Sequence, residues 1–154
     1  MVTTSIGATH ELDLVAGLYR TTNAFVRELD RRLVQEHGVT FIQAVTLLAI
    51  DSFDRPQPRL VADFLSQQSQ TVTGVLDRLE RAGHVLRLRD LEDRRAVRLQ
   101  LTASGTEIVR AIEGRLLVHV SSLLASVDRP TRDRLQRDLE TLEASVRTTS
   151  AGAS

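Results

Sequence analysis

The sequence contains no cysteine, no lysine and no tryptophan among its 154 residues. Without cysteine it can form no disulfide, zinc–thiolate site or thiol-based catalytic or redox centre. No apolar run approaches the roughly 20 residues that a membrane span needs, and residues 1–10 lack the basic start and apolar core of a secretory signal. With 42% hydrophobic and 26% charged residues, the composition predicts one globular, cytoplasmic domain with no membrane partner.

The charges of the chain cancel, with 20 basic and 20 acidic residues. A neutral total argues at first against a nucleic-acid partner, because such proteins are usually basic. The distribution is uneven, however: residues 59–98 contain 8 arginines and 6 acids, whereas residues 1–58 contain 5 and 7 and residues 99–154 contain 7 and 7. Residues 59–98 are therefore the segment expected to bind a polyanion such as a nucleic acid. All basic side chains in this segment are arginines.

Apolar residues at helical spacing predict long helices at both ends of the chain. The first runs from about Thr9 to Glu36 and ends at Gly38. At 1.5 Å per residue it spans about 40 Å, more than a small domain needs, so part of its face is expected to meet another chain. From Thr102 a helix is predicted to continue to Val127. Another begins at Asp128, and residues 148–154 are expected to fray.

The middle of the chain predicts three shorter helices. Residues 40–51 begin with Thr40 and Gln43 at the spacing of a capping box. A short helix at 59–65 and another at 69–82 follow, with Ser69 as the expected cap of the latter. Two short helices joined by a tight polar turn are typical of a helix-turn-helix.

A change of period from 3.6 to 2 then predicts a β-hairpin at residues 85–89 and 96–101. In the first strand, Leu86 and Leu88 are predicted to face the core, and Arg87 and Arg89 to face outward. The connection at 90–95 is charged. The fold class is therefore mainly α with a small β-hairpin wing, a winged helix-turn-helix.

Three segments of this region resemble MarR-type regulators. Residues 69–87, SQTVTGVLDRLERAGHVLR, are similar to the recognition helix and first wing strand of that family. Residues 90–96, DLEDRRA, are similar to its wing tip, and residues 101–105, LTASG, to the exit from the wing. The Asp-Arg-Arg wing at this distance from a recognition helix is the specific part of the match.

The resemblance implies an N-terminal dimerisation helix at 1–38, a DNA-binding lobe at 39–105 and C-terminal dimerisation helices at 106–154, intertwined in a homodimer. It implies a transcription factor on a pseudo-palindromic operator of double-stranded DNA, most often a repressor, frequently released by a small phenol or aromatic acid. It implies neither catalysis nor a cofactor. A winged helix used for protein contacts without DNA is the alternative.

Candidate DNA-binding residues follow from these expectations. On the recognition helix, short polar groups suited to the major groove are Gln70, Thr71 and Thr73, while Ser69 and Arg78 are expected near phosphates. Gly74 departs from the family pattern, in which a longer side chain often stands at this place. On the wing, Arg95 is predicted to enter the minor groove and Arg94 to meet the adjacent phosphate. Phosphates are also expected within reach of three strand residues, Arg87, Arg89 and Arg98.

Asp93 and a group of helical residues have other expected roles. Asp93 is expected to orient the wing by holding a neighbouring arginine, since a carboxylate would be repelled by phosphate. A ligand pocket is predicted from residues on helices that could line it, namely Tyr19, Asn23, Arg27, Phe41, Val45 and Ile112; the alternative is that they are core and solvent residues. The four histidines, at 10, 37, 84 and 119, are scattered and predict no metal site.

Overall fold

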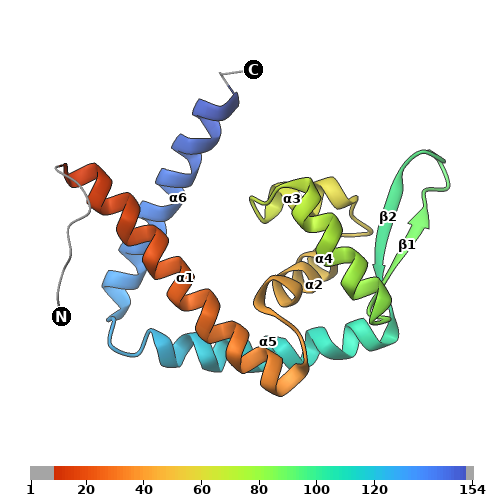
Figure 1. Cartoon of the computed structure of the whole chain (residues 1–154), viewed down its shortest axis with the longest axis horizontal. Helices are drawn as coiled ribbons and strands as arrows, with labels where there is room; N and C mark the ends of the chain where they lie inside the picture. Colours follow the sequence, from red (N-terminus) through yellow and green to blue (C-terminus); the bar gives the residue numbers. More distant parts are fainter. Residues whose placement is uncertain (1–8, 152–154) are drawn as a thin grey trace. The chain divides into compact units, whose positions relative to one another are not determined.

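The computed structural model describes residues 9–151, which form six helices and two strands. Their contacts divide the chain into one unit that ends at Leu116 and a second that begins at Leu117. The boundary lies inside the long helix α5 (Ala103–Leu123). Figure 1 shows the elements of both units.

The first unit begins with α1 (His10–His37) and α2 (Phe41–Ser52), which meet at a well-defined corner. Gly38 ends α1 with a φ of 69°, a left-handed conformation that glycine adopts without strain. The predicted capping box of Thr40 and Gln43 is present at the start of α2. The carboxylate of Asp30 on α1 also accepts the Phe41 N–H at 2.5 Å, which ties the two helices together.

The helix-turn-helix consists of α3 (Pro58–Phe64) and α4 (Ser69–Arg81). It is followed by the antiparallel strands β1 (Val85–Arg89) and β2 (Val97–Leu101). The Leu99 N–H also donates to the Pro56 carbonyl at 2.9 Å, so the loop before α3 lies along the outer edge of the hairpin. The winged helix-turn-helix predicted from the sequence is thus confirmed. Its main core contains completely or almost completely buried side chains from all these elements, among them Leu47, Val61, Leu76, Leu79, Val85 and Leu99.

The facing of β1 was predicted wrongly. Val85 is completely buried, whereas Leu86 is 46% exposed. The register pairs Val85 with Leu101 and Arg87 with Leu99, so these four side chains share the face that covers the core. An arginine is tolerated on that face because α4 supplies acidic partners for it, as described below.

The cap of α4 also differs from the prediction. Gln68 is the N-cap residue, and it makes no side-chain capping hydrogen bond. Ser69 is the first helical residue, and its carbonyl accepts the Thr73 hydroxyl at 2.9 Å. The side chain of the N-cap residue therefore does not cap the start of α4.

The second unit consists of the end of α5 and α6 (Arg129–Ala151). The carboxylate of Asp128 accepts the Thr131 N–H at 3.0 Å and caps α6, as its position predicts. Arg132 donates to the carbonyls of Leu124 and Val127, both at 2.7 Å, and so stabilises the turn between the helices.

The predicted fraying of the C-terminus was wrong for residues 148–151, which continue α6. Thr148 and Thr149 donate their hydroxyls to the carbonyls of Ala144 and Ser145, so these polar residues are satisfied inside the helix. Residues 152–154 lie outside the described residues. No single helix of residues 9–151 has both the length and the apolarity to cross a membrane; only α1 and α2 taken together, across a 76° bend, meet those criteria.

Candidate nucleic-acid interface

Helix α4 presents one polar, exposed face. Its buried face consists of Val72, Val75, Leu76 and Leu79, which pack into the core. The opposite face exposes the residues of this helix that were predicted to contact DNA, namely Ser69, Gln70, Thr71, Thr73 and Arg78. Among the described residues, the side chains of Gln70, Thr71 and Arg78 have no hydrogen-bond or ion-pair partner. Their donors and acceptors are therefore available to another molecule, as a recognition helix requires.

The tip of the wing is held by Asp90. Its carboxylate accepts the backbone N–H groups of Glu92 at 2.8 Å and Asp93 at 3.3 Å. It also pairs with the Arg98 guanidinium at 2.5 Å. The hydrogen bond from the Glu92 N–H, followed by those from Arg98 and the Asp93 N–H, lowers the pKa of Asp90 to about 2. Asp90 was not predicted to have this role, although an aspartate at the start of a turn is a signal for such contacts.

Asp93 fixes the same turn in another way. Its carboxylate accepts the backbone N–H of Arg95 at 3.0 Å, and its carbonyl accepts the Ala96 N–H at 2.9 Å. Asp93 thus contacts the turn of the wing through backbone N–H groups and not through an arginine side chain. The acid that binds an arginine side chain is Asp90. Both acids are used within the hairpin.

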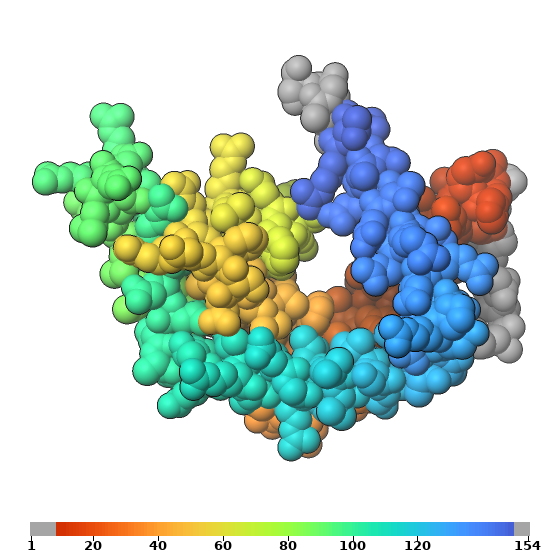
Figure 2. Space-filling model, turned by 180° about the vertical axis from the view of Figure 1, so that it is seen from behind, coloured from red at the N-terminus to blue at the C-terminus, as the bar shows by residue number. Residues whose placement is uncertain are grey.

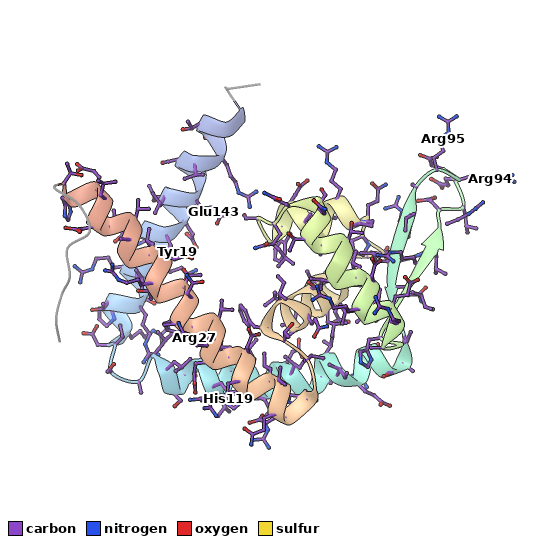
Figure 3. All side chains as sticks on the ribbon, in the orientation of Figure 1. Tyr19, Arg27, Arg94, Arg95, His119 and Glu143 are labelled. Carbon is purple, nitrogen blue, oxygen red and sulfur yellow. The ribbon has the colours of Figure 1, made fainter. Side chains whose placement is uncertain are left out.

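Arg94 and Arg95 lie at the end of the hairpin and point away from it, as Figure 3 shows. The hairpin itself projects from the body of the unit (Figure 2). Both arginines are exposed, and neither side chain has an ion-pair partner among residues 9–151; the same is true of Arg89 on β1. The three guanidinium groups are therefore available for phosphate or for a groove.

Two other candidate arginines are occupied within the protein. Arg87 pairs with Asp77 at 2.7 Å and with Glu80 at 2.5 Å, both on α4, and its side chain is only 26% exposed. Arg98 pairs with Asp90 and donates to the Arg55 carbonyl at 3.4 Å. Arg87 links the wing to α4, and Arg98 links it to the loop before α3.

The base of the wing is closed by contacts to the start of α5. The Thr102 hydroxyl donates to the Gly83 carbonyl at 2.6 Å, and His84 Nδ1 lies 3.0 Å from the Ser104 hydroxyl. Gly105 is buried against this joint, because a Cβ there would lie 2.1 Å from the His84 carbonyl oxygen. The exit from the wing thus requires a residue without a side chain at position 105.

The predicted ligand residues are separated into two groups. Tyr19, Asn23 and Arg27 lie one turn apart on the exposed face of α1, and Figure 3 shows two of them. Ile112 is completely buried and packs with Phe41 in a second core cluster. Val45 is half-buried one turn after Phe41 on α2. Phe41 and Ile112 therefore serve as core residues.

No group of three or more metal-binding side chains occurs in residues 9–151.

Comparison with known proteins shows which proteins this chain resembles. Residues 37–96, from the end of α1 to the wing tip, match the family model described as MarR family. The regulator TtmR of Methylorubrum extorquens is 33% identical over 103 residues, which are 67% of this chain and 50% of that protein. The chain thus contains a MarR-family segment at residues 37–96. The chain spans about half to three fifths of the length of the first curated relatives it matches, which are named HTH-type transcriptional regulators.

Solved structures of MarR-type proteins share the fold. The S. aureus MepR–DNA complex superposes with a TM-score of 0.78 at 23% identity, over 86% of this chain and 97% of the other. PcaV from Streptomyces coelicolor, in complex with its natural ligand, gives 0.75 at 20% identity, over 95% and 99%. At these identities the likeness establishes the fold of this chain.

Proposed function

We propose that this protein is a sequence-specific DNA-binding transcriptional regulator of the MarR family that acts in the cytoplasm. The observation that carries the proposal is the polar, exposed face of α4 together with the exposed Arg94 and Arg95 at the tip of the adjacent hairpin, whose guanidinium groups have no ion-pair partner among residues 9–151. Short polar side chains on a helix suit base edges in the major groove. Arginines on a projecting loop suit the neighbouring phosphates and the negative potential of a narrow minor groove.

The proposal includes a homodimer on a pseudo-palindromic operator. An apolar row on α1 is largely exposed, with Val15 62% and Tyr19 72% accessible. Separately, the second unit exposes an apolar row on α6, formed by Leu135, Leu139, Leu142 and Val146. Faces of this kind are typical of surfaces that another chain covers. A dimer would hold two copies of α4 about one turn of DNA apart, roughly 34 Å.

Repression relieved by a small phenol or aromatic acid completes the proposal. The PcaV structure holds that protein's natural ligand, which supports a ligand response for a chain of the same fold. On this chain, Arg27 would bind a carboxylate, and Tyr19 and Asn23 would contact the rest of the molecule. A ligand releases DNA by as much as its affinities for the two conformations differ.

The alternative function is a winged helix that binds a protein and no DNA. That function calls for an apolar exposed face on α4, but the apolar residues of this helix are buried and the exposed ones are polar. DNA is therefore the better partner for this surface.

Titration of DNA tests the main proposal. Fluorescence anisotropy would compare a duplex from the region upstream of the protein's own gene with a random duplex of equal length, at low salt. We expect tighter binding to the former, and about tenfold or greater loss on both for the double variant Arg94→Ala/Arg95→Ala. Absence of binding to either duplex at low salt would overturn the proposal, and addition of candidate phenolic acids tests the ligand response in the same assay.

A further inference from the structure

One stripe of α4 contains a gap. Gln70, Gly74 and Arg78 are four residues apart, so they follow one another along the same face of the helix. Gln70 and Arg78 are exposed at the two ends of this stripe, and Gly74 has no side chain to fill the space between them. We call this space the Gly74 notch. It lies in the middle of the polar face proposed to meet DNA.

The guanidinium of Arg78 lies over this notch. Within the described residues, and apart from adjacent residues and the nearby backbone of the helix itself, the one atom within 4 Å of an ideal Cβ at Gly74 is Nη2 of Arg78, at 3.9 Å. Helical side chains lean toward the N-terminus, so Arg78 is directed along the stripe toward Gln70. It therefore brings its charge to the place that a side chain at position 74 would occupy.

The acids beside Arg78 are bound elsewhere. Asp77 and Glu80 both pair with Arg87 of β1. Among residues 9–151 the Arg78 guanidinium has neither an acceptor nor an ion-pair partner. An arginine that is unpaired, directed along a polar face and next to a gap keeps its planar set of donors for an external acceptor.

We propose that Gly74 and Arg78 act together as a specificity determinant, in which Arg78 reads a guanine through the Gly74 notch. This inference rests on the DNA-binding function proposed above. The guanidinium matches the O6 and N7 acceptors of guanine in the major groove. The sequence alone predicts Arg78 at a flanking phosphate instead, where it would add affinity for every sequence and no base preference. The notch distinguishes the two roles, because it leaves room for the guanidinium within the stripe that faces the bases.

Selection from a library of random DNA duplexes tests the proposal for wild type, Arg78→Ala, Arg78→Lys and Arg81→Ala. The wild type should select a two-fold symmetric consensus with one strongly preferred guanine in each half-site. Arg78→Ala and Arg78→Lys should both reduce that preference by about tenfold and leave the other positions unchanged, because lysine keeps the charge without the paired donors. Arg81→Ala removes an equal charge from the last turn of the same helix and should select the wild-type consensus.

Substitution of the glycine tests the notch itself. Gly74→Leu should lose the same guanine preference as Arg78→Ala, and Gly74→Ala should lie between Gly74→Leu and wild type, because its Cβ makes only an ordinary contact with Arg78. Both residues favour helix more than glycine does, so neither variant should have a lower melting temperature than wild type.

The outcomes separate this inference from the proposed function. If the wild type selects no sequence, sequence-specific binding fails, and this inference fails with it. If the wild type selects a consensus that Arg78→Ala reproduces with equal preference at every position, the DNA-binding function stands and the inference is wrong. If Arg78→Lys behaves as wild type while Arg78→Ala loses affinity for all duplexes equally, Arg78 contacts phosphate and the inference is wrong.

Discussion

Arg87 illustrates how the role of a single residue depends on its partners. On the strand pattern it belongs with the other wing arginines, but its guanidinium is bound by Asp77 and Glu80 of α4. Removal of one partner from a half-buried ion pair is destabilising, because the remaining charges are left without a partner. Arg87 is therefore better placed to set the angle between wing and recognition helix than to neutralise a phosphate.

This role predicts the behaviour of Arg87→Ala. DNA affinity should fall by roughly tenfold, because the wing and the helix are no longer held at the angle that they have in the complex. The dependence of log K on log salt should stay within error of wild type, because every phosphate contact is still made once the complex forms. Anisotropy titrations at several salt concentrations measure both quantities.

Arg89→Ala provides the matched control, because Arg89 is two residues away on the same strand and has no ion-pair partner among the described residues. It should reduce the salt slope by about 0.9. A reduced slope for Arg87→Ala as well would assign Arg87 to phosphate after all.

Gly105 is the residue where a single methyl group should matter most. The Cβ of Gly105→Ala would lie 2.1 Å from the His84 carbonyl oxygen, and a backbone atom cannot move aside as a flexible side chain can. We expect the free energy of unfolding to fall by about 2 kcal/mol or more, in the upper part of the range for overpacking. Chemical denaturation of Gly105→Ala and of wild type measures this difference in the free energy of unfolding.

Gly114→Ala on the same helix is the comparison. It is exposed, nothing lies within 4 Å of its would-be Cβ, and the substitution should stabilise α5 by up to ~1 kcal/mol. Equal effects of the two substitutions would mean that helix propensity, and not the contact with His84, governs position 105.

At the scale of elements, local signals predicted most of the fold. Gly38 and the pair Thr40 and Gln43 mark the α1–α2 corner through contacts with their own neighbours in the chain, which a sequence pattern captures. The facing of β1 was wrong because it depends on a distant element: only the acids of α4 make an arginine acceptable on the covered face. The stripe formed by Gly74 and Arg78 was also missed, since the direction of a long side chain is not encoded in spacing.

The carboxylate of Asp90 makes the largest number of contacts in the turn of the wing. Because the pKa of Asp90 is about 2 in the folded protein and its ordinary value is 3.8, the ionised form stabilises the fold. That stabilisation is fully present above about pH 4 and is lost as the pH falls through 2. Asp90→Asn should therefore have a lower free energy of unfolding than wild type near pH 6, and this difference should shrink between pH 4 and pH 2.

Denaturant titrations of both proteins at pH 6 and pH 2.5 measure the difference. Glu92→Gln, which changes an exposed acid of the same turn whose side chain has no partner among the described residues, should leave the free energy of unfolding almost unchanged at pH 6. A deficit of Asp90→Asn that stays constant down to pH 2 would show that the Asp90 charge does not stabilise the wing.

At the scale of the whole molecule, the 20 basic and 20 acidic residues balance, and several of them also pair with each other locally. Three of the arginines in the positive segment form ion pairs inside the lobe: Arg59 with Asp63, Arg87 with Asp77 and Glu80, and Arg98 with Asp90. Only a few unpaired arginines then remain for DNA, so non-specific attraction should be weak. A single lobe would bind poorly, and useful affinity would require two lobes on one duplex.

That requirement predicts how a disrupted dimer behaves. Leu139 is 43% exposed in the apolar row of α6, and Leu139→Glu places a charge where a partner chain would exclude water. Light scattering should then give the mass of one chain instead of two, and affinity for the selected duplex should fall by at least about 100-fold, because the second half-site no longer binds intramolecularly. Leu60→Glu, at a leucine 44% exposed on α3, is the matched control and should remain dimeric. A monomeric Leu139→Glu that keeps wild-type affinity would mean that one lobe suffices, and the charge argument would then have to be abandoned.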